Sequence, residues 1–232
     1  MLNFIKESYN YNYIQNSKWI IIFVHWLTGS KDEEMYIQWE SFFNNHGYST
    51  IRFNLYWDLP WEKKLEEVSL QNHIDDVNSV IDFCVSENHK NIFLVGHSYW
   101  WIVNLYVKYD NIKKILMRDP SIGWEVLLQD VYEDRNWKHY IDWWDWYKFY
   151  ISEALYKDFL RPSEEYLDRI ARISLPIKII GAEHWLAKAG ERYYNAITSN
   201  EKEFIIVSWA NHTFTETGID TLLNESLNWI EK

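Results

Sequence analysis

The hydrophobic positions of this sequence follow two alternating patterns. Short β-branched runs that are apolar on both faces recur six times, as expected for strands covered by helices on both sides. These runs are Lys18–His25, Ser49–Leu55, Asn91–Val95, Ile112–Met117, Pro176–Gly181 and Glu203–Val207. Segments with helical periodicity separate most of them. This alternation predicts an α/β fold with a mostly parallel central sheet flanked by helices.

Four segments carry helix signals. Glu34–Asn45 keeps apolar residues at helical spacing and is followed by a glycine. Ser69–Glu87 repeats apolar residues three and four positions apart, a stripe that should pack on the sheet. Ser163 is expected to cap a helix that ends near Arg172, and a last helix runs from about Gly218 to Ile230.

One long segment interrupts the alternation. Residues 123–160 follow the fourth predicted strand and are rich in Trp, Tyr and Asp, so we interpret them as an inserted cap. No repeat, low-complexity tract or linker marks a second domain. We therefore expect residues 1–232 to form one domain, with the cap inside it. The hydrophobic content of 47% is enough for one sizeable core.

Composition excludes several classes of protein. The formal net charge of -11 is spread along the chain, which argues against a phosphate-binding surface and against nucleic acid as a partner. Cys84 is the single cysteine, so no internal disulfide or thiolate metal cluster is possible. The amino-terminal residues lack a signal-peptide pattern and no apolar run could span a bilayer. We expect a cytoplasmic protein without membrane contact, of open oligomeric state.

The clearest chemical motif lies in Asn91–Leu105, where an apolar strand is followed by Gly-His-Ser-Tyr-Trp and an apolar helix. A serine at a sharp strand-to-helix turn is the setting of a nucleophile elbow, in which small residues two positions before and after let strand and helix approach closely. Gly96 meets that requirement and Trp100 does not. Ser98 is therefore the candidate nucleophile. The alternative is a helix N-cap serine without chemistry.

With this motif, the chain from about Lys18 to Glu231 resembles the α/β-hydrolase superfamily, and in particular its small, cinnamoyl-esterase-like carboxylesterases. His25–Gly29 (HWLTG), after the first strong strand, resembles the family's oxyanion loop, HGxTG in many members. The resemblance implies that the backbone N–H groups of Leu27 and Tyr99 form the oxyanion hole. The alternative for the first loop is an ordinary turn at a strand end.

The resemblance extends to the histidine and the acid of a catalytic triad. Asn211–Phe214 (NHTF) is similar to the loop that delivers the catalytic histidine in esterases, which implies that His212 is the general base. The family usually supplies the acid after the penultimate strand, where Glu183 is the only carboxylate. Asp119, at the end of the fourth strand, is the alternative acid. Either carboxylate could instead be an ordinary solvated loop residue.

The resemblance implies a serine hydrolase that cleaves small-molecule carboxylic esters of small or medium acyl groups through an acyl-enzyme, with no metal and no organic cofactor. Tyr140–Tyr150 resembles the hairpin cap that covers the acyl pocket in such esterases, which makes aromatic acyl groups plausible. A thioesterase, a monoacylglycerol lipase or a small peptidase would use the same triad. A hydrolase-like binding protein without catalysis is the alternative from another class, because Trp26 and Trp100 stand in the oxyanion region.

Tryptophan is unusually common and glycine unusually rare. The chain has 15 Trp and 7 Gly, whereas an average chain of this length would have roughly twice as many Gly. Trp26, Trp100, Trp101 and Trp209 stand where the resembled family commonly has glycine, and Trp144 and Trp146 lie in a turn-like, Asp-rich stretch. One hypothesis is that the gene comes from a bacterial lineage that reads the UGA codon as glycine. In the chain as written, tryptophan at these positions is expected to overpack the elbow and weaken the enzyme.

Overall fold

The six apolar runs form six of the seven strands of one large sheet in the computed structural model. The structure describes residues 8–56, 62–122, 131–144, 147–215 and 217–232, and of residues 143, 144 and 147 it describes the backbone only. The strands are β1 (Tyr9–Asn12), β2 (Ile20–Val24), β3 (Ser49–Phe53), β4 (Ile92–His97), β5 (Ile112–Arg118), β6 (Val131–Glu133), β7 (His139–Trp144), β8 (Tyr147–Tyr150), β9 (Ile177–Ala182) and β10 (Lys202–Val207). The helices are α1 (Glu34–Asn45), α2 (Leu70–Ser86), α3 (Glu153–Phe159), α4 (Ser163–Ile170), α5 (Ala187–Ala196) and α6 (Ile219–Glu231), with 3₁₀ helices η2 (Leu65–Glu67) and η3 (Ser98–Leu105).

The large sheet has the order β1-β3-β2-β4-β5-β9-β10, and all its pairings are parallel except that of β1 with β3. The chain passes from β2 outward to β3 and then returns to β4 on the other side of β2. The point between β2 and β4 is therefore the topological switch point, outside whose carboxyl ends α/β sheets place their ligand sites.

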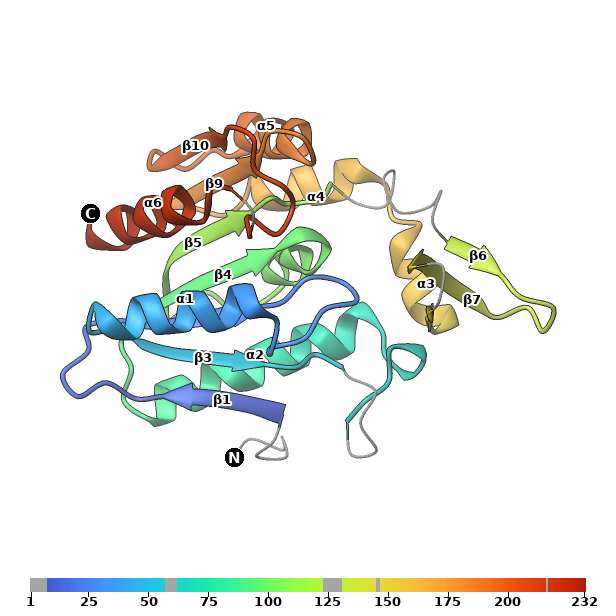
Figure 1. The fold of residues 1–232 in the computed structure, drawn as a ribbon, viewed down its shortest axis with the longest axis horizontal. Helices are drawn as coiled ribbons and strands as arrows, with labels where there is room; N and C mark the ends of the chain where they lie inside the picture. The colour runs from blue at the N-terminus through green and yellow to red at the C-terminus, as the bar shows by residue number, and fades with distance from the viewer. Residues whose placement is uncertain (1–7, 57–61, 123–130, 145–146, 216) are drawn as a thin grey trace.

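Alternate side chains of the strands face two helical layers. Ile20 and Ile22 pack with residues of α2, η3, α4 and α5, whereas Ile21 and Phe23 pack with residues of α1 and α6. Figure 1 shows α1 and α6 in front of the sheet. Burial on both faces explains why β2 is apolar throughout, as the sequence pattern predicts.

A second, three-stranded antiparallel sheet, β6-β7-β8, lies inside the segment predicted as a cap. Figure 1 shows it beside α3 and apart from the large sheet. The predicted hairpin Tyr140–Tyr150 corresponds to paired β7 and β8. Helix α3 connects this region to the elbow, because the rings of Phe159 and Tyr99 lie 4.8 Å apart and both are buried.

The predicted α/β fold is confirmed, and three local features differ from the prediction. The edge strand β1 and helix α5 were not predicted, because neither has a distinctive apolar pattern. Ser163 is not the cap of α4: the helix follows Pro162, and the Ser163 hydroxyl donates to the carbonyl of Ile122. Pro162 is the N-cap residue, its carbonyl accepts from the N–H of Glu165, and no side chain caps the helix.

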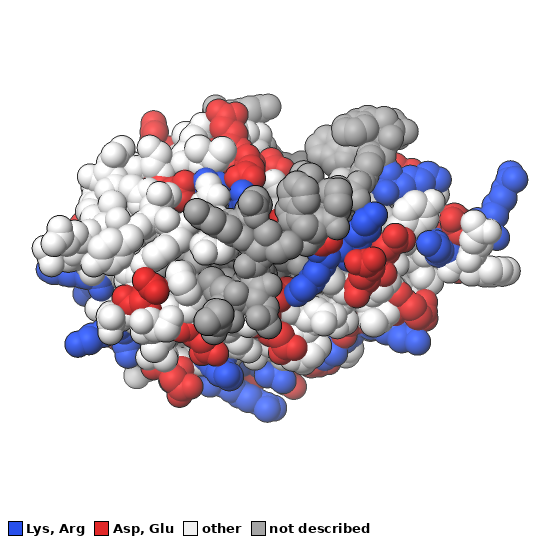
Figure 2. Space-filling model, turned by 90° about the horizontal axis from the view of Figure 1, so that it is seen from below, with Lys and Arg blue, Asp and Glu red and all other residues white. Residues whose placement is uncertain are grey.

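The described surface is electrostatically mixed. Figure 2 shows acidic and basic side chains interspersed on one face of the molecule, in keeping with the net charge of -11. In the described part of the chain, no helix is both long and apolar enough to cross a membrane. The same residues contain no group of three or more His, Cys, Asp or Glu side chains arranged to hold a metal ion.

Candidate active site

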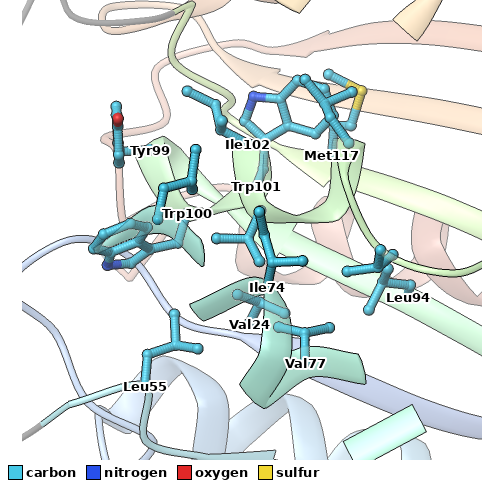
Figure 3. Packing of buried hydrophobic residues seen from close by; sticks show 14 of the residues in the cluster. Val24, Leu55, Ile74, Val77, Leu94, Tyr99, Trp100, Trp101, Ile102 and Met117 are labelled. Atoms are coloured by element: carbon cyan, nitrogen blue, oxygen red, sulfur yellow. The ribbon is translucent and has the colours of Figure 1, made fainter. Parts of the chain in front are cut away.

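Ser98 lies at a sharp turn between β4 and η3. Its φ of +58° is left-handed, a conformation that non-glycine residues adopt rarely and mostly at functional turns. A Cβ atom on Gly96 would lie 2.7 Å from the Cα atom of Trp101, so only glycine lets strand and helix approach this closely. Figure 3 shows Tyr99, Trp100 and Trp101 pointing to different sides of this turn. The local geometry is that of a nucleophile elbow.

The structure brings Ser98, His212 and Asp119 into one hydrogen-bonded chain. His212 Nε2 lies 2.8 Å from the Ser98 hydroxyl, and His212 Nδ1 lies 2.5 Å from Asp119 Oδ2. A carboxylate only accepts, so Nδ1 carries the proton and Nε2 accepts from the serine. All three residues are buried, with Asp119 fully inaccessible to solvent.

Asp119 is held rigidly in place. It directly follows β5, its N–H donates to the Ile180 carbonyl at 2.7 Å, and its Oδ1 accepts from the N–H of Ala182 at 2.9 Å. The backbone at Asp119 is left-handed, with a φ of +37°. The second carboxylate oxygen is thereby directed at His212. Such fixed partners are what keep a catalytic imidazole in one tautomer and one orientation.

Glu183, the acid favoured by the sequence, is not the carboxylate at His212. Its side chain is 44% exposed, and its Oε2 accepts from the N–H of Trp209 at 2.9 Å. The topology explains the difference. Strand β5 is next to β4, which carries Ser98, whereas Glu183 follows β9, one strand further away. The Trp185 ring, from the same loop as Glu183, lies against His212.

The predicted oxyanion loop after β2 leaves one backbone donor available. The Trp26 N–H donates to the Tyr36 hydroxyl at 2.9 Å, and the Thr28 N–H donates to the Tyr56 hydroxyl at 2.6 Å. No described residue accepts from the Leu27 N–H between them, nor from the N–H of Tyr99 after the serine. These are the two groups that the resemblance implies for the oxyanion hole.

Aromatic rings enclose His212. The ring of Trp185 is stacked on it with centroids 5.5 Å apart, the ring of Trp26 meets it edge-on at 5.8 Å, and that of His97 lies at 4.7 Å. Trp185 is 62% exposed and His212 is only 8% exposed. The imidazole therefore lies in an apolar setting with a solvent-accessible indole beside it.

Comparison with solved structures identifies the architecture. The chain is similar to Est1E from Butyrivibrio proteoclasticus with bound ferulic acid, with a TM-score of 0.76 at 16% identity over 97% of this chain and 95% of that one. The chain has the α/β-hydrolase fold. A structure from work on the metagenome-derived lipolytic enzymes LipS and LipT matches with a TM-score of 0.72 at 17% identity, covering 97% of both chains.

A monoacylglycerol lipase from Paleococcus ferrophilus is another structural neighbour of this chain, with a TM-score of 0.68 at 14% identity over 95% of this chain and 96% of that one. No protein-family model matches the sequence, and no curated protein matches it. The structural neighbours include an esterase domain, a lipase, a dienelactone hydrolase and a putative non-heme bromoperoxidase.

Tryptophan side chains crowd the region behind the elbow. Trp100 is fully buried with its ring centroid 4.3 Å from that of His73, and neither His73 ring nitrogen has a hydrogen-bond partner among the described residues. Trp26 also has a buried indole N–H without a partner in this part of the structure. The backbone at Trp100 is not left-handed, so its cost is one of packing.

Trp209 differs from the other tryptophans of this set. It is 76% exposed and has a left-handed φ of +61°. Trp137, in the turn between β6 and β7, shows the same combination, with 79% exposure and a φ of +60°. Glycine is favoured in this conformation, and in hairpin turns it commonly follows asparagine, as Trp137 follows Asn136. The side chains of Trp144 and Trp146 lie outside the described residues.

We expect Trp209→Gly and Trp137→Gly each to raise the free energy of unfolding by about 1 kcal/mol, because glycine relieves the left-handed strain of an exposed residue. Urea unfolding would measure the change. The matched controls Trp209→Ala and Trp137→Ala remove the ring and keep the Cβ atom, so they should bring no such gain. Equal stability of the Gly and Ala variants would contradict this interpretation.

Three residues near the site were not identified from the sequence. Tyr36 from α1, His97 before the nucleophile and Arg118 at the end of β5 all contact the oxyanion or histidine loops. The sequence alone gave little indication of their roles. His97 lacks the sequence context of a catalytic histidine, and Arg118 stands as a single cation at the end of an apolar strand. The one clue in the sequence was an arginine at the end of a predicted strand, directly before Asp119; in the structure this arginine is buried.

Proposed function

We propose that this chain is a serine hydrolase that cleaves carboxylic esters of small or medium acyl groups through an acyl-enzyme. The supporting observation is the hydrogen-bonded chain Ser98–His212–Asp119, in which Ser98 and Asp119 follow the adjacent strands β4 and β5 and His212 lies in the loop after β10. Along the chain the order is serine after β4, acid after β5 and histidine after β10, and the order serine, acid, histidine is the one that serine hydrolases of this fold use. The position of the acid differs, because the family usually supplies it after the penultimate strand.

The residues divide the reaction as follows. His212 Nε2 takes the proton of the Ser98 hydroxyl as its oxygen attacks the ester carbonyl, and Asp119 stabilises the imidazolium. The N–H groups of Leu27 and Tyr99 donate to the oxyanion of the tetrahedral intermediate. His212 then returns the proton to the leaving alcohol. A water molecule, activated by the same histidine, hydrolyses the acyl-enzyme and frees Ser98.

The apolar surroundings support an aromatic or short aliphatic acyl group. Trp185 offers an exposed indole beside His212, and Trp26 packs on the same ring. Flat apolar surfaces near fixed polar groups are typical of sites for small organic ligands. The ferulic acid in the Est1E structure is a ligand of this kind. A thioester or an amide would meet the same catalytic groups.

Binding without catalysis is the second candidate, because Trp26 and Trp100 place two indoles in the oxyanion and elbow regions. The Trp26 indole lies against the backbone of the oxyanion loop, because a Cβ atom on Gly29 would lie 2.1 Å from the Trp26 ring. Crowding of this kind could hold a ligand and still prevent the acyl carbonyl from reaching both oxyanion donors.

Hydrolysis of p-nitrophenyl acetate, butyrate and octanoate and of methyl ferulate separates the two candidates. We expect turnover of the shorter esters and of methyl ferulate, with a kcat/KM of about 10³ M⁻¹s⁻¹. This value lies below the usual range for enzymes because the tryptophans crowd the site. Calorimetric titration with ferulate serves as the control for binding. Ferulate binding by a folded sample without turnover of any ester would favour the binding protein and contradict the proposed hydrolase.

A further inference from the structure

Three hydrogen bonds connect the oxyanion loop to the histidine loop through two side chains. The Trp26 N–H donates to the Tyr36 hydroxyl at 2.9 Å, that hydroxyl lies 2.9 Å from His97 Nδ1, and His97 Nε2 lies 3.0 Å from the carbonyl oxygen of His212. Tyr36 and His97 are almost completely buried. The two loops come from opposite ends of the sequence and meet at the switch point of the sheet.

The direction of each bond follows from the chemistry of its atoms. The His212 carbonyl only accepts, so His97 Nε2 carries a proton. Burial, together with the nearby Arg118 and His212, holds the pKa of His97 well below its usual value, so its other nitrogen is unprotonated and accepts. Burial also raises the pKa of Tyr36, which stays protonated and donates to His97. One hydrogen-bond pattern satisfies every atom of the connection.

The histidine loop, between β10 and α6, needs such a connection because its described residues, 208–215 and 217–218, form turns and no helix or strand. Within the loop, the Thr217 hydroxyl donates to the Trp209 carbonyl, but the carbonyl groups of His212 and Thr213 are held by side chains from β4 and β5. Arg118 donates to the Thr213 carbonyl and packs against the ring of Phe214 at 5.0 Å. His97 holds the adjacent carbonyl, that of His212 itself. The catalytic ring is thereby fixed from its own backbone.

We propose that Tyr36 and His97 are positioning residues that set the His212 imidazole in register with the oxyanion loop, an inference that rests on the proposed serine hydrolase function. Neither side chain reaches the reacting atoms in this arrangement. They act through the Trp26 N–H on one side and the His212 carbonyl on the other. Displacement of catalytic groups by about 1 Å costs about 100-fold in rate, which sets the scale of the effect.

We expect Tyr36→Phe to lower kcat by about 10- to 100-fold with KM changed less than about threefold, because substrate contacts remain and only alignment is lost. His97→Leu should lower kcat similarly, and His97→Gln should restore part of it, since its amide N–H can replace Nε2–H. The double variant Tyr36→Phe/His97→Leu should be no worse than the more damaging single variant, as expected for one connected unit.

Tyr109→Phe is the matched control. Like Tyr36→Phe, it removes a tyrosine hydroxyl that donates a hydrogen bond, but this partly buried hydroxyl donates to the carbonyl of Asn104, away from both loops. It should leave kcat unchanged whatever it does to thermal stability. Wild-type kcat in Tyr36→Phe, or equal kcat in His97→Gln and His97→Leu, would overturn the positioning role.

A measurement on the unmodified protein keeps the proposal testable if a variant does not fold. Nitrogen-15 NMR of the histidine rings should show His97 as the neutral Nε2–H tautomer. An Nδ1–H tautomer or a charged His97 would overturn the proposal. Lack of ester turnover in the wild type would instead refute the proposed function, and it would do so without affecting the tautomer result.

Discussion

Asp119→Asn is expected to lower kcat for ester hydrolysis by about 10⁴-fold with little change in KM. The amide cannot accept from His212 Nδ1–H while its NH₂ faces that nitrogen, so the imidazole shifts to the wrong tautomer and the imidazolium loses its counter-charge. Asp119 is fully buried and also accepts from the Ala182 N–H. Steady-state kinetics with p-nitrophenyl butyrate would measure the loss.

Glu183→Gln is the control that distinguishes the two carboxylates. The glutamine oxygen can still accept from the Trp209 N–H, so the loop should keep its shape and kcat should stay close to the wild-type value. The reverse result, with Glu183→Gln inactive and Asp119→Asn active, would show that the loop after β9 supplies the acid.

Ser98→Ala is expected to reduce kcat by a factor on the order of 10⁶, because triad residues act as a unit and the nucleophile has no substitute. Ser226→Ala removes another buried serine hydroxyl, one that donates to the Leu222 carbonyl within α6, and should leave kcat unchanged. Retention of full turnover in Ser98→Ala would mean that another group performs the attack.

Much of the fold was predictable because its signals are local. The central strand β2 is buried on both faces and apolar throughout, and α1 and α2 begin and end within one or two residues of the prediction. Gly96 before Ser98 indicated the elbow because only a residue without a Cβ atom fits there. When a residue is required by a contact with residues close to it in sequence, as Gly96 is, the requirement can be read from the residue type.

The carboxylate beside His212 is not the one that the sequence favoured, because which carboxylate reaches the histidine depends on strand order, and strand order cannot be read from single residues. Asp119 and Glu183 both follow strands, and only the adjacency of β5 to β4 brings the aspartate to His212. The connection through Tyr36 and His97 was invisible for the same reason: its partners are 61 and 115 residues apart. Such contacts follow from tertiary structure.

Reaction of the purified wild-type chain with a fluorophosphonate, followed by peptide mass spectrometry, tests the central claim most directly. An activated serine attacks the phosphorus and becomes covalently labelled, whereas ordinary serines do not. We predict one adduct per chain, on the peptide that contains Ser98. A folded protein that remains unlabelled, or that carries its adduct on another residue, would contradict the assignment of Ser98, His212 and Asp119 as a catalytic triad.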